Sequence, residues 1–344
     1  WLYEAYPSVY YASAQEDQAL EWASFWSFLV AGVVFAAAAL RQWRASRMLP
    51  WFLAGLALFC VVVAMEEISW GQRVFGHQPP EYFLSENYQQ ELNVHNFASR
   101  SLRVWTFRGI ILGYGVLLPL LGLFSWARGR LTRLGVVSPP LSLSPAMFAL
   151  FWVHLDYPWK FTGEIIECGL GFAFLFAAID ARATFDDTAR AHFPRHAIAL
   201  PVLVIAAGFA TAAWSQNRAS ARPETLAAAR AEAAALAEDF RALAKSRDVA
   251  SVTDCNLHKR LFTFAQKNAL EEALSSGSFA SRLEAAGQGA RAEYFLDPWN
   301  LPYWIRDRCD KHTGRRVIMI YSFGPNRSRD SSRWELLGDD IGVY

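Results

Sequence analysis

Long apolar runs occupy the first 215 residues of this chain and become sparse after them. A helix needs about 20 consecutive apolar residues to cross a bilayer, and its backbone polar groups must be satisfied internally. The chain is 53% hydrophobic with a formal net charge of +1. This balance gives no indication of nucleic acid as a partner, because nucleic-acid-binding domains are basic. The sequence therefore predicts an α-helical polytopic membrane bundle followed by a soluble C-terminal domain.

Six apolar segments are candidate membrane spans. The fourth is short, so it is either a true span or a re-entrant or interfacial segment. The six segments lie at about 22–41, 49–68, 106–127, 144–157, 163–181 and 196–214.

Arginine residues cluster in alternate connections between these spans. Positive residues are retained on the cytoplasmic side of a membrane. We therefore expect an outer N-terminal segment at 1–21, a transmembrane domain at 22–215 and an outer domain at 216–344. In a bacterium with two membranes, this is an inner-membrane protein with both ends in the periplasm. The orientation depends on Arg41, Arg44, Arg47, Arg128, Arg130, Arg133, Arg182, Arg190 and Arg195.

Polar residues gather at the expected outer face. The apolar run at 51–65 is too short to cross a bilayer, so its helix carries Glu66 and Glu67 near the interface. Carboxylates at that depth are costly and usually have a partner or a function. On a continuous helix, Glu66, Trp70 and Arg73 would share one stripe. The candidate binding residues are Glu66, Glu67, Gln72, Arg73, Glu91 and His95, and the candidate catalytic residues are Glu66, Glu67, His95, His154, Asp156, Glu164 and Glu167.

Three interpretations of this outer-face group remain open. In the first, the residues are structural: Glu66 pairs with Arg73, and the amides of the following loop satisfy backbone groups. In the second, His and carboxylate side chains hold a metal that activates a water for hydrolysis. In the third, the group binds a lipid head group or a pigment, with tryptophans as walls.

Two motifs in this region carry a resemblance. EEISWGQR at 66–73 and ENYQQELNVHN at 86–96 resemble a motif pair of a family of uncharacterised bacterial multi-spanning membrane proteins. The resemblance covers about 60–100. It implies a polytopic membrane protein and no known activity.

The region after the spans changes character. Pro223 opens an alanine-rich helical pattern that runs to about 247, since proline is favoured in the first helical turn. Another helical stretch is expected at about 256–274. DPWNLPYWIRD at 297–307 is turn-rich and aromatic, and RRVIMIYSFGPN at 315–326 predicts a strand that leads into a Gly-Pro turn.

These C-terminal motifs carry a second resemblance. DPWNLPY, YSFGPN and GDDI, in this order over about 295–344, resemble the C-terminal half of type II secretion major pseudopilins. The resemblance implies an α+β pilin-like soluble domain, in which a long helix at 223–247 lies on a small antiparallel sheet near 295–344. The chain departs from the family because it has no prepilin cleavage signature, and because five predicted spans precede the sixth.

The pseudopilin resemblance also implies a calcium-binding loop. By motif, Asn326 stands where the family has an aspartate, and Asp340 stands at the aspartate before isoleucine. Asp330 in the intervening loop is the third candidate ligand. Such hard oxygen ligands suit Ca²⁺, although Asn326 removes one charge from the loop.

Four cysteines divide evenly between the two regions. Cys60 and Cys168 lie in predicted spans, where cysteine acts as a small apolar residue. Cys255 and Cys309 lie in the predicted outer domain, where an even pair favours a disulfide. The alternative is two separate buried thiols.

Two functions from different classes fit these observations. The first is a non-enzymatic scaffold or accessory subunit of a larger envelope complex, either secretory, respiratory or photosynthetic. Its partners would be membrane lipids and other membrane-protein subunits. The second is a membrane-embedded metal-dependent hydrolase that acts on a lipid-like substrate at the periplasmic face. The chain contains no GxGxxG, GxxxxGK[ST] or GxSxG motif that would indicate nucleotide or serine-hydrolase chemistry.

Overall fold

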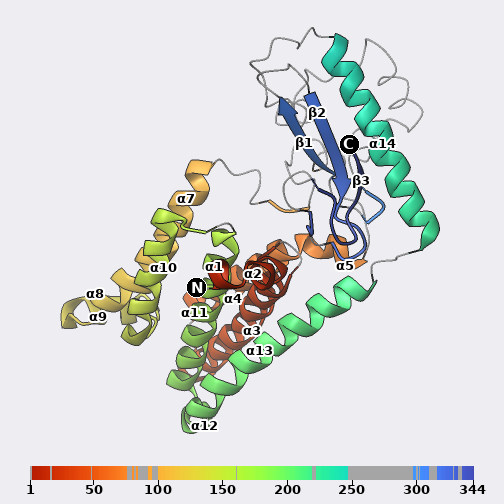
Figure 1. The fold of residues 1–344 in the computed structure, drawn as a ribbon. Helices are drawn as coiled ribbons and strands as arrows, with labels where there is room; N and C mark the ends of the chain where they lie inside the picture. Colours follow the sequence, from red (N-terminus) through yellow and green to blue (C-terminus); the bar gives the residue numbers. More distant parts are fainter. Residues whose placement is uncertain are drawn as a thin grey trace. The chain divides into compact units, whose positions relative to one another are not determined.

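The computed structural model (Figure 1) describes the chain in two compact units. The first unit contains Trp1–Trp70 and Ala98–Ala213, and the second contains Gly71–Phe97 and Trp214–Tyr344. We describe each unit by itself. The described residues are 2–246 and 297–344, except for 16–17, 48, 76–79, 81–82, 84–91, 95–99, 160, 219–221, 300, 302, 310–315, 328 and 332–334.

The first unit is helical. In the described part of the chain, four helices are long and apolar enough to cross a membrane: Ala19–Ser46, Ser101–Leu121, Thr162–Phe185 and Phe193–Ser215. The protein is therefore a membrane protein by the length and composition of its helices. The helical elements of this unit are α1 (Leu2–Ala5), α2 (Pro7–Ala14), α3 (Ala19–Ser46), α4 (Trp51–Glu67), α7 (Arg100–Arg108), η3 (Gly109–Leu117), α8 (Leu118–Leu121), α9 (Ser125–Arg133), η4 (Leu141–Leu143), α10 (Ser144–Asp156), α11 (Thr162–Phe185) and α12 (Asp187–Ala191), together with the first parts of η1 (Ser69–Gly71) and of α13 (Phe193–Arg218), which continue into the second unit.

The centre of the first unit is the packing of α3 against α4 and α11 (Figure 1). Small residues let these helices approach closely, since Gly171 of α11 faces Ser27 of α3. Phe174 is 2% exposed, and its ring lies 5.8 Å from that of Phe28 and 5.1 Å from that of Tyr114. The aromatic cluster around Phe174 therefore joins three separate segments of the chain.

Two of the six predicted spans are short helices. Helix α4 has 17 residues and α10 has 13, so they are about 25 Å and about 20 Å long. The hydrocarbon core of a bilayer is about 30 Å thick. In the described part of the chain, the structure thus gives four full-length candidate spans. The two short helices could cross only where the bilayer is locally thinned.

The third predicted span ends earlier than the sequence indicates. Its helix includes a π-helical segment, η3, and stops at Leu121. The amides of Leu123 and Phe124 then bond back three residues, and Phe124 takes an extended conformation with φ −85° and ψ 125°. The apolar residues at 122–124 therefore form a turn, and the prediction of a continuous span to 127 is wrong. The chain restarts as the separate helix α9.

The helix that carries Glu66 and Glu67 breaks directly after them. Ser69, Trp70 and Gly71 all have positive φ angles, of 46°, 53° and 78°. Non-glycine residues rarely adopt this conformation, which ends a right-handed helix. A continuous helix from Glu66 to Arg73 is therefore wrong. Two short elements, η1 (Ser69–Gly71) and α5 (Gln72–Phe75), follow the break.

The second unit places one long helix, α14 (Pro223–Ser246), on an antiparallel sheet (Figure 1). Among the described residues, the sheet has the strand order β1–β2–β3. Trp304 of β1 pairs with Tyr321 of β2, and Ser322 of β2 pairs with Ile341 of β3. The strands are β1 (Trp304–Cys309), β2 (Arg316–Ser322) and β3 (Ile341–Val343).

The interface between α14 and the sheet is apolar, and the hydroxyl of one tyrosine adds hydrogen bonds to it. Ala229 of α14 packs with Trp299 and Ile341 in one buried cluster. Tyr303 is 1% exposed, and its hydroxyl lies 2.7 Å from Oε2 of Glu232 and 3.2 Å from the carbonyl oxygen of Ala229. Buried tyrosines usually use their hydroxyl in this way. The residues around DPW therefore dock the helix onto the sheet.

Candidate functional site

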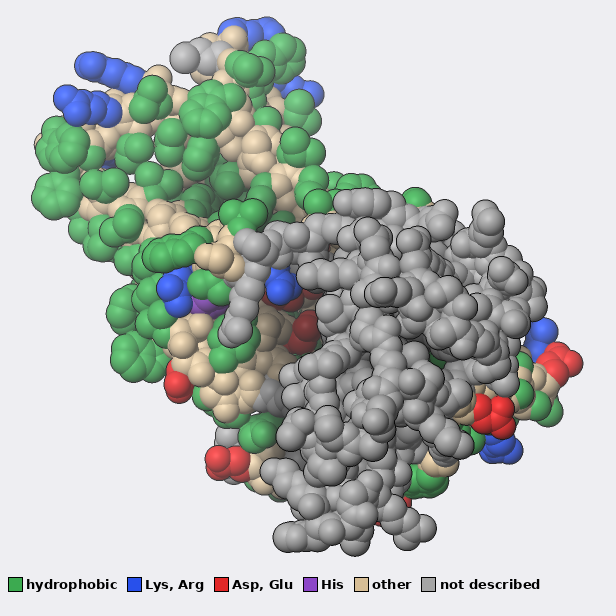
Figure 2. Space-filling model, turned by 90° about the horizontal axis from the view of Figure 1, so that it is seen from above, with side chains coloured by type: hydrophobic (Ala, Val, Ile, Leu, Met, Phe, Trp, Pro, Cys, Tyr) green, Lys and Arg blue, Asp and Glu red, His purple; other side chains and the backbone are tan. Residues whose placement is uncertain are grey.

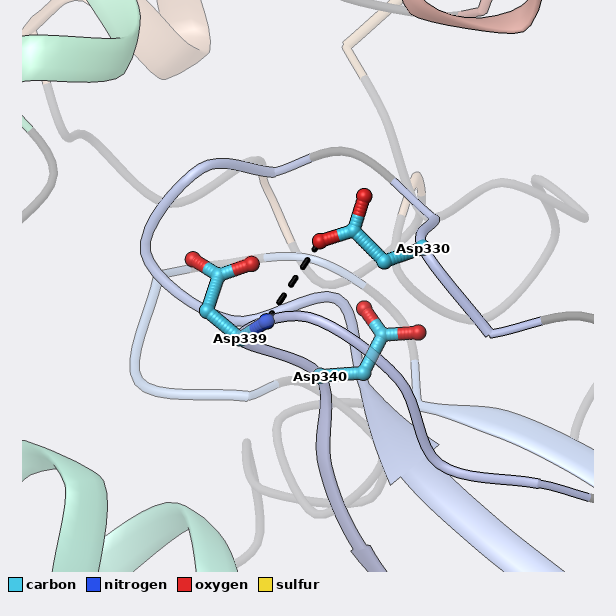
Figure 3. A group of neighbouring side chains, drawn as sticks. All are labelled: Asp330, Asp339 and Asp340. Carbon is cyan, nitrogen blue, oxygen red and sulfur yellow. Dashed lines mark hydrogen bonds between the residues drawn. The ribbon is translucent and has the colours of Figure 1, made fainter. Parts of the chain in front are cut away.

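Three carboxylates converge in the C-terminal loop of the second unit. One ligand oxygen from each of Asp330, Asp339 and Asp340 lies within 4.8 Å of the others (Figure 3). Among the described residues, this is the one group of three or more His, Cys, Asp or Glu side chains that converges in this way. Asp330 comes from the loop after β2, and the other two directly precede β3. We call these three residues the acidic cluster.

Hydrogen bonds fold the loop around the acidic cluster. The backbone amide of Asn326 donates to Oδ2 of Asp339 at 3.0 Å, and its side-chain amide donates to Oδ2 of Asp330 at 2.9 Å. The amide of Ser331 donates to Oδ2 of Asp340 at 2.6 Å. The amide of Asp339 donates to Oδ2 of Asp330 at 3.4 Å (Figure 3). These hydrogen bonds therefore connect the turn after β2 to the turn before β3.

The electrostatics of the acidic cluster favour a bound cation. Burial raises the pKa of Asp339 to about 6, with an added contribution from the neighbouring Asp330 carboxylate. Burial also raises the pKa of Asp340 to about 6. The Oδ1 atoms of Asp339 and Asp340 are buried and have no hydrogen-bond partner in the described part of the chain. Such oxygens, next to like charges, suit a hard cation such as Ca²⁺.

The structure places the predicted calcium ligands as follows. Asp330 and Asp340 lie together, and Asp339, which the sequence analysis did not include, joins them. Asn326 lies beside the cluster, where its NH₂ group donates to Asp330. The adjacent acidic pair at 339–340 was the available signal for Asp339.

A second buried carboxylate organises the same end of the sheet. Asp297 is 3% exposed. Its Oδ1 accepts hydrogen bonds from the amides of Trp299 and Leu301, at 2.9 and 2.8 Å. The hydroxyl of Ser322, at the end of β2, donates to its Oδ2. Burial raises the pKa of Asp297 to about 6, and these donors, Ser322 first, limit the rise. The sequence indicates a turn at DPW but not this buried role.

The outer-face residues of the first unit are partly brought together. Oε1 of Glu66 accepts a hydrogen bond of 2.7 Å from the indole nitrogen of Trp70. Glu67 lies beside Ser24 of α3 and is close enough to Glu167 of α11 and to Glu66 for electrostatic interaction. Glu164 lies near Cys168 on α11. The end of α4, the start of α11 and the start of α3 thus meet at one end of the bundle.

The other predicted site residues of the described part lie in different surroundings. His154 is 4% exposed, its ring stacks on Phe107 at 5.7 Å, and Arg108 is its charged neighbour. Asp156 is exposed. Gln72 belongs to the second unit, where its Oε1 accepts from the amide of Leu92 at 2.7 Å. His154 therefore lies with aromatic and cationic groups.

Several predictions fall outside the described residues. These are Glu91, His95, the side chain of Arg73, the helix expected at 256–274, and Cys255 with the side chain of Cys309. Cys60 and Cys168 are buried free cysteines.

Comparison with known proteins found no matching family model, no matching curated protein and no matching solved structure.

Proposed function

We propose that this chain is a non-enzymatic scaffold or accessory subunit of a larger complex in the bacterial inner membrane. Its apolar helices differ in how much of them is buried within the chain, and this contrast carries the proposal. In the apolar windows of Ala19–Ser46 and Thr162–Phe185, 56% and 61% of the residues are buried. In Ser101–Leu121 and Phe193–Ser215, the share is 17% for each. The last two helices leave broad apolar faces for lipid or for other chains.

The exposed face of α13 illustrates this surface. Val202, Leu203 and Phe209 are 58%, 61% and 60% exposed. Figure 2 shows hydrophobic side chains over broad areas of the described surface on the face drawn. Helices associate in lipid through close packing and not through hydrophobic burial alone. We propose that partner helices cover part of α13 and of the 101–121 helix in the assembled complex.

We further propose that the second unit is a periplasmic pilin-like module, connected to six spans. Support comes from the long helix α14 packed on an antiparallel sheet, and from the DPW turn and C-terminal loop that join them. Ca²⁺ at Asp330, Asp339 and Asp340 would neutralise their mutual repulsion and satisfy the buried Oδ1 atoms. The module then offers a rigid surface for an envelope partner.

The surroundings of His154 argue for this function over a metal-dependent hydrolase. A hydrolase built on His154 needs carboxylates around its ring as ligands or orienting groups. The described neighbours are instead Phe107, Tyr157 and Arg108. The arginine would repel a metal cation, so a structural role for His154 agrees better with the geometry.

Site-specific photo-crosslinking in native membranes tests the subunit role. A photoreactive residue in place of Val202 or Phe209 should give a discrete crosslinked protein band. The same residue in place of Leu58 on α4, which is 66% exposed, is the matched control for general lipid exposure. Position-dependent bands that contain the same partner support the proposal. Lipid adducts alone at all three positions would reject it.

A further inference from the structure

One end of the first unit combines tryptophans with arginines on three neighbouring segments. The indole nitrogen of Trp51, at the start of α4, donates to the carbonyl oxygen of Leu134, just after α9, at 2.7 Å. This bond fixes the end of α9 beside the start of α4. Only residues 47–50 separate α4 from the end of α3. The end of α3, the start of α4 and α9 therefore belong to one surface.

Aromatic and cationic side chains lie next to one another on this surface. Trp43, Trp51 and Trp126 are 45%, 52% and 60% exposed. The guanidinium of Arg47 lies 5.7 Å from the centre of the Trp43 ring, and that of Arg130 lies 5.5 Å from the centre of the Trp126 ring. Stacking of this kind orders an arginine while its planar edge keeps the geometry that matches phosphate. We call Trp43, Arg44, Arg47, Trp51, Trp126, Arg128, Arg130 and Arg133 the Trp-Arg surface.

The charge around the Trp-Arg surface is strongly positive. The segments 22–65 and 92–155, which contain it, have no Asp or Glu. Two acidic residues near this end, the N-cap Asp186 and the first residue of α12, Asp187, have cationic partners. Asp186 pairs with Arg41 at 3.3 Å and with Arg182 at 2.7 Å, and the exposed Asp187 pairs with Arg190 at 3.3 Å. The segments that form the surface therefore supply no anion to its arginines.

The position of α9 relates this charge to the membrane. Exposed apolar residues precede and follow α9 in the sequence: Leu123 and Phe124 are each 56% exposed, and Leu134 is 61% exposed. Arg128 and Arg130 are exposed between them. Tryptophan and arginine next to apolar residues mark the level of the lipid head groups. Figure 2 shows Lys and Arg side chains beside hydrophobic ones on the described surface.

We propose that the Trp-Arg surface binds the phosphates of anionic phospholipids in the leaflet where this end of the bundle lies. The arginines form charge-assisted hydrogen bonds to the phosphate oxygens, and the indole rings lie along the glycerol region. Helix α9 acts as an interfacial element that holds these lipids beside the bundle. This inference depends only on the first unit and is independent of the role of the second.

Native mass spectrometry of the full chain released from nanodiscs tests this proposal. Nanodiscs of phosphatidylcholine mixed with phosphatidylglycerol should leave phosphatidylglycerol preferentially bound to the wild type. In Arg128→Gln/Arg130→Gln, this preference should fall on the order of tenfold, since each such arginine contributes near an anionic lipid surface. Arg103→Gln/Arg230→Gln, which removes two exposed arginines outside the surface, is the control with the same charge change and should keep the preference.

Other outcomes overturn the proposal. Equal retention of both lipids by the wild type, or an unchanged preference in Arg128→Gln/Arg130→Gln, would exclude anionic lipid as the ligand. Inorganic phosphate that by itself raises the melting temperature as much as phosphatidylglycerol would assign the surface to free phosphate. Equal melting temperatures of Arg128→Gln/Arg130→Gln and the wild type in pure phosphatidylcholine nanodiscs show that the variant is folded. If the variant melts at a lower temperature, the lipid preference of Arg44→Gln/Arg47→Gln is measured in its place.

Discussion

Individual aspartates in the second unit carry most of its polar organisation. Asp297 satisfies two backbone amides and one hydroxyl, and Asp330, Asp339 and Asp340 fix the loop between β2 and β3. Motif wording led to Asp340 from the sequence, and position in the intervening loop led to Asp330. It did not lead to Asp339 or to the buried role of Asp297, because both depend on how separate turns meet in space.

Replacing Asp297 by alanine should destabilise the second unit. The substitution leaves the amides of Trp299 and Leu301 and the hydroxyl of Ser322 without their acceptor. Each buried donor left unsatisfied is costly, so the loss should be about 3 kcal/mol. Thermal unfolding of the full chain in detergent measures it. Asp187→Ala, at an exposed position, is the control. Equal melting temperatures for the two variants would show that Asp297 does not hold the turn.

The acidic cluster should make the C-terminal loop dependent on pH. The folded-state pKa of Asp339 and Asp340 is about 6, raised from an ordinary value of 3.8. A raised pKa means that protonation favours the folded loop. This contribution is full below pH of about 4 and is lost as the pH rises through about 6. In chelator, the wild-type loop should resist proteolysis better at pH 5 than at pH 7.5, and Asp339→Asn/Asp340→Asn should flatten this difference.

Calcium should reverse this dependence, because it binds the deprotonated carboxylates. Added Ca²⁺ should protect the loop at pH 7.5 and have little effect at pH 5. The Asp339→Asn/Asp340→Asn variant should not respond at either pH. A wild type that is equally protected with and without Ca²⁺ at pH 7.5 would reject the ion while leaving the fold of the loop unaffected.

At the scale of helices and strands, apolar runs and turn residues predicted much of what the structure contains. The apolar run before Arg41 lies in α3, and RVIMIYS forms β2 before the Gly-Pro turn. The ends of elements were harder to predict. The break at Ser69–Gly71 uses positive φ at two non-glycine residues, and the early stop at Leu121 depends on a turn among apolar residues. Neither leaves a signal in hydrophobic periodicity.

The pairing of Cys255 with Cys309 remains a prediction at this scale. A bond between them would link β1 to the segment after α14 and could contribute about 4 kcal/mol on the chain-entropy model. Alkylation of the denatured, unreduced protein followed by mass spectrometry counts the free thiols. Two alkylated cysteines, Cys60 and Cys168, are expected. Four would show that the pair is reduced and would weaken the periplasmic placement of the second unit.

For the whole molecule, the sequence predicted a helical membrane part followed by a part with strands, and the structure contains both. Four helices of the described chain have the length and composition of spans. Composition can identify apolar length, but it cannot decide whether α4 and α10 cross, because local bilayer thickness decides that for short helices. The outer-face site was the least predictable, since its members approach only through the packing of α3, α4 and α11.

The arginines of the chain predict its orientation. With Arg41, Arg44 and Arg47 on the cytoplasmic side, a reporter fused after Arg47 should be cytoplasmic and one fused after Trp214 should be periplasmic. Paired phosphatase and fluorescent-protein fusions at both positions give the result. Fusions on the same side would contradict the six-span topology, and α10 would be the first segment to reassign.

The most direct test of the subunit role is the mass of the particle that contains this chain. The chain, expressed at its natural level, is extracted in a mild detergent and measured by native mass spectrometry. The proposed function predicts a defined assembly with a mass well above that of one copy of the protein, which loses its partners when Val202 and Phe209 are both changed to Trp. A particle that contains a single copy of the protein with bound lipid, unchanged by these substitutions, would contradict it.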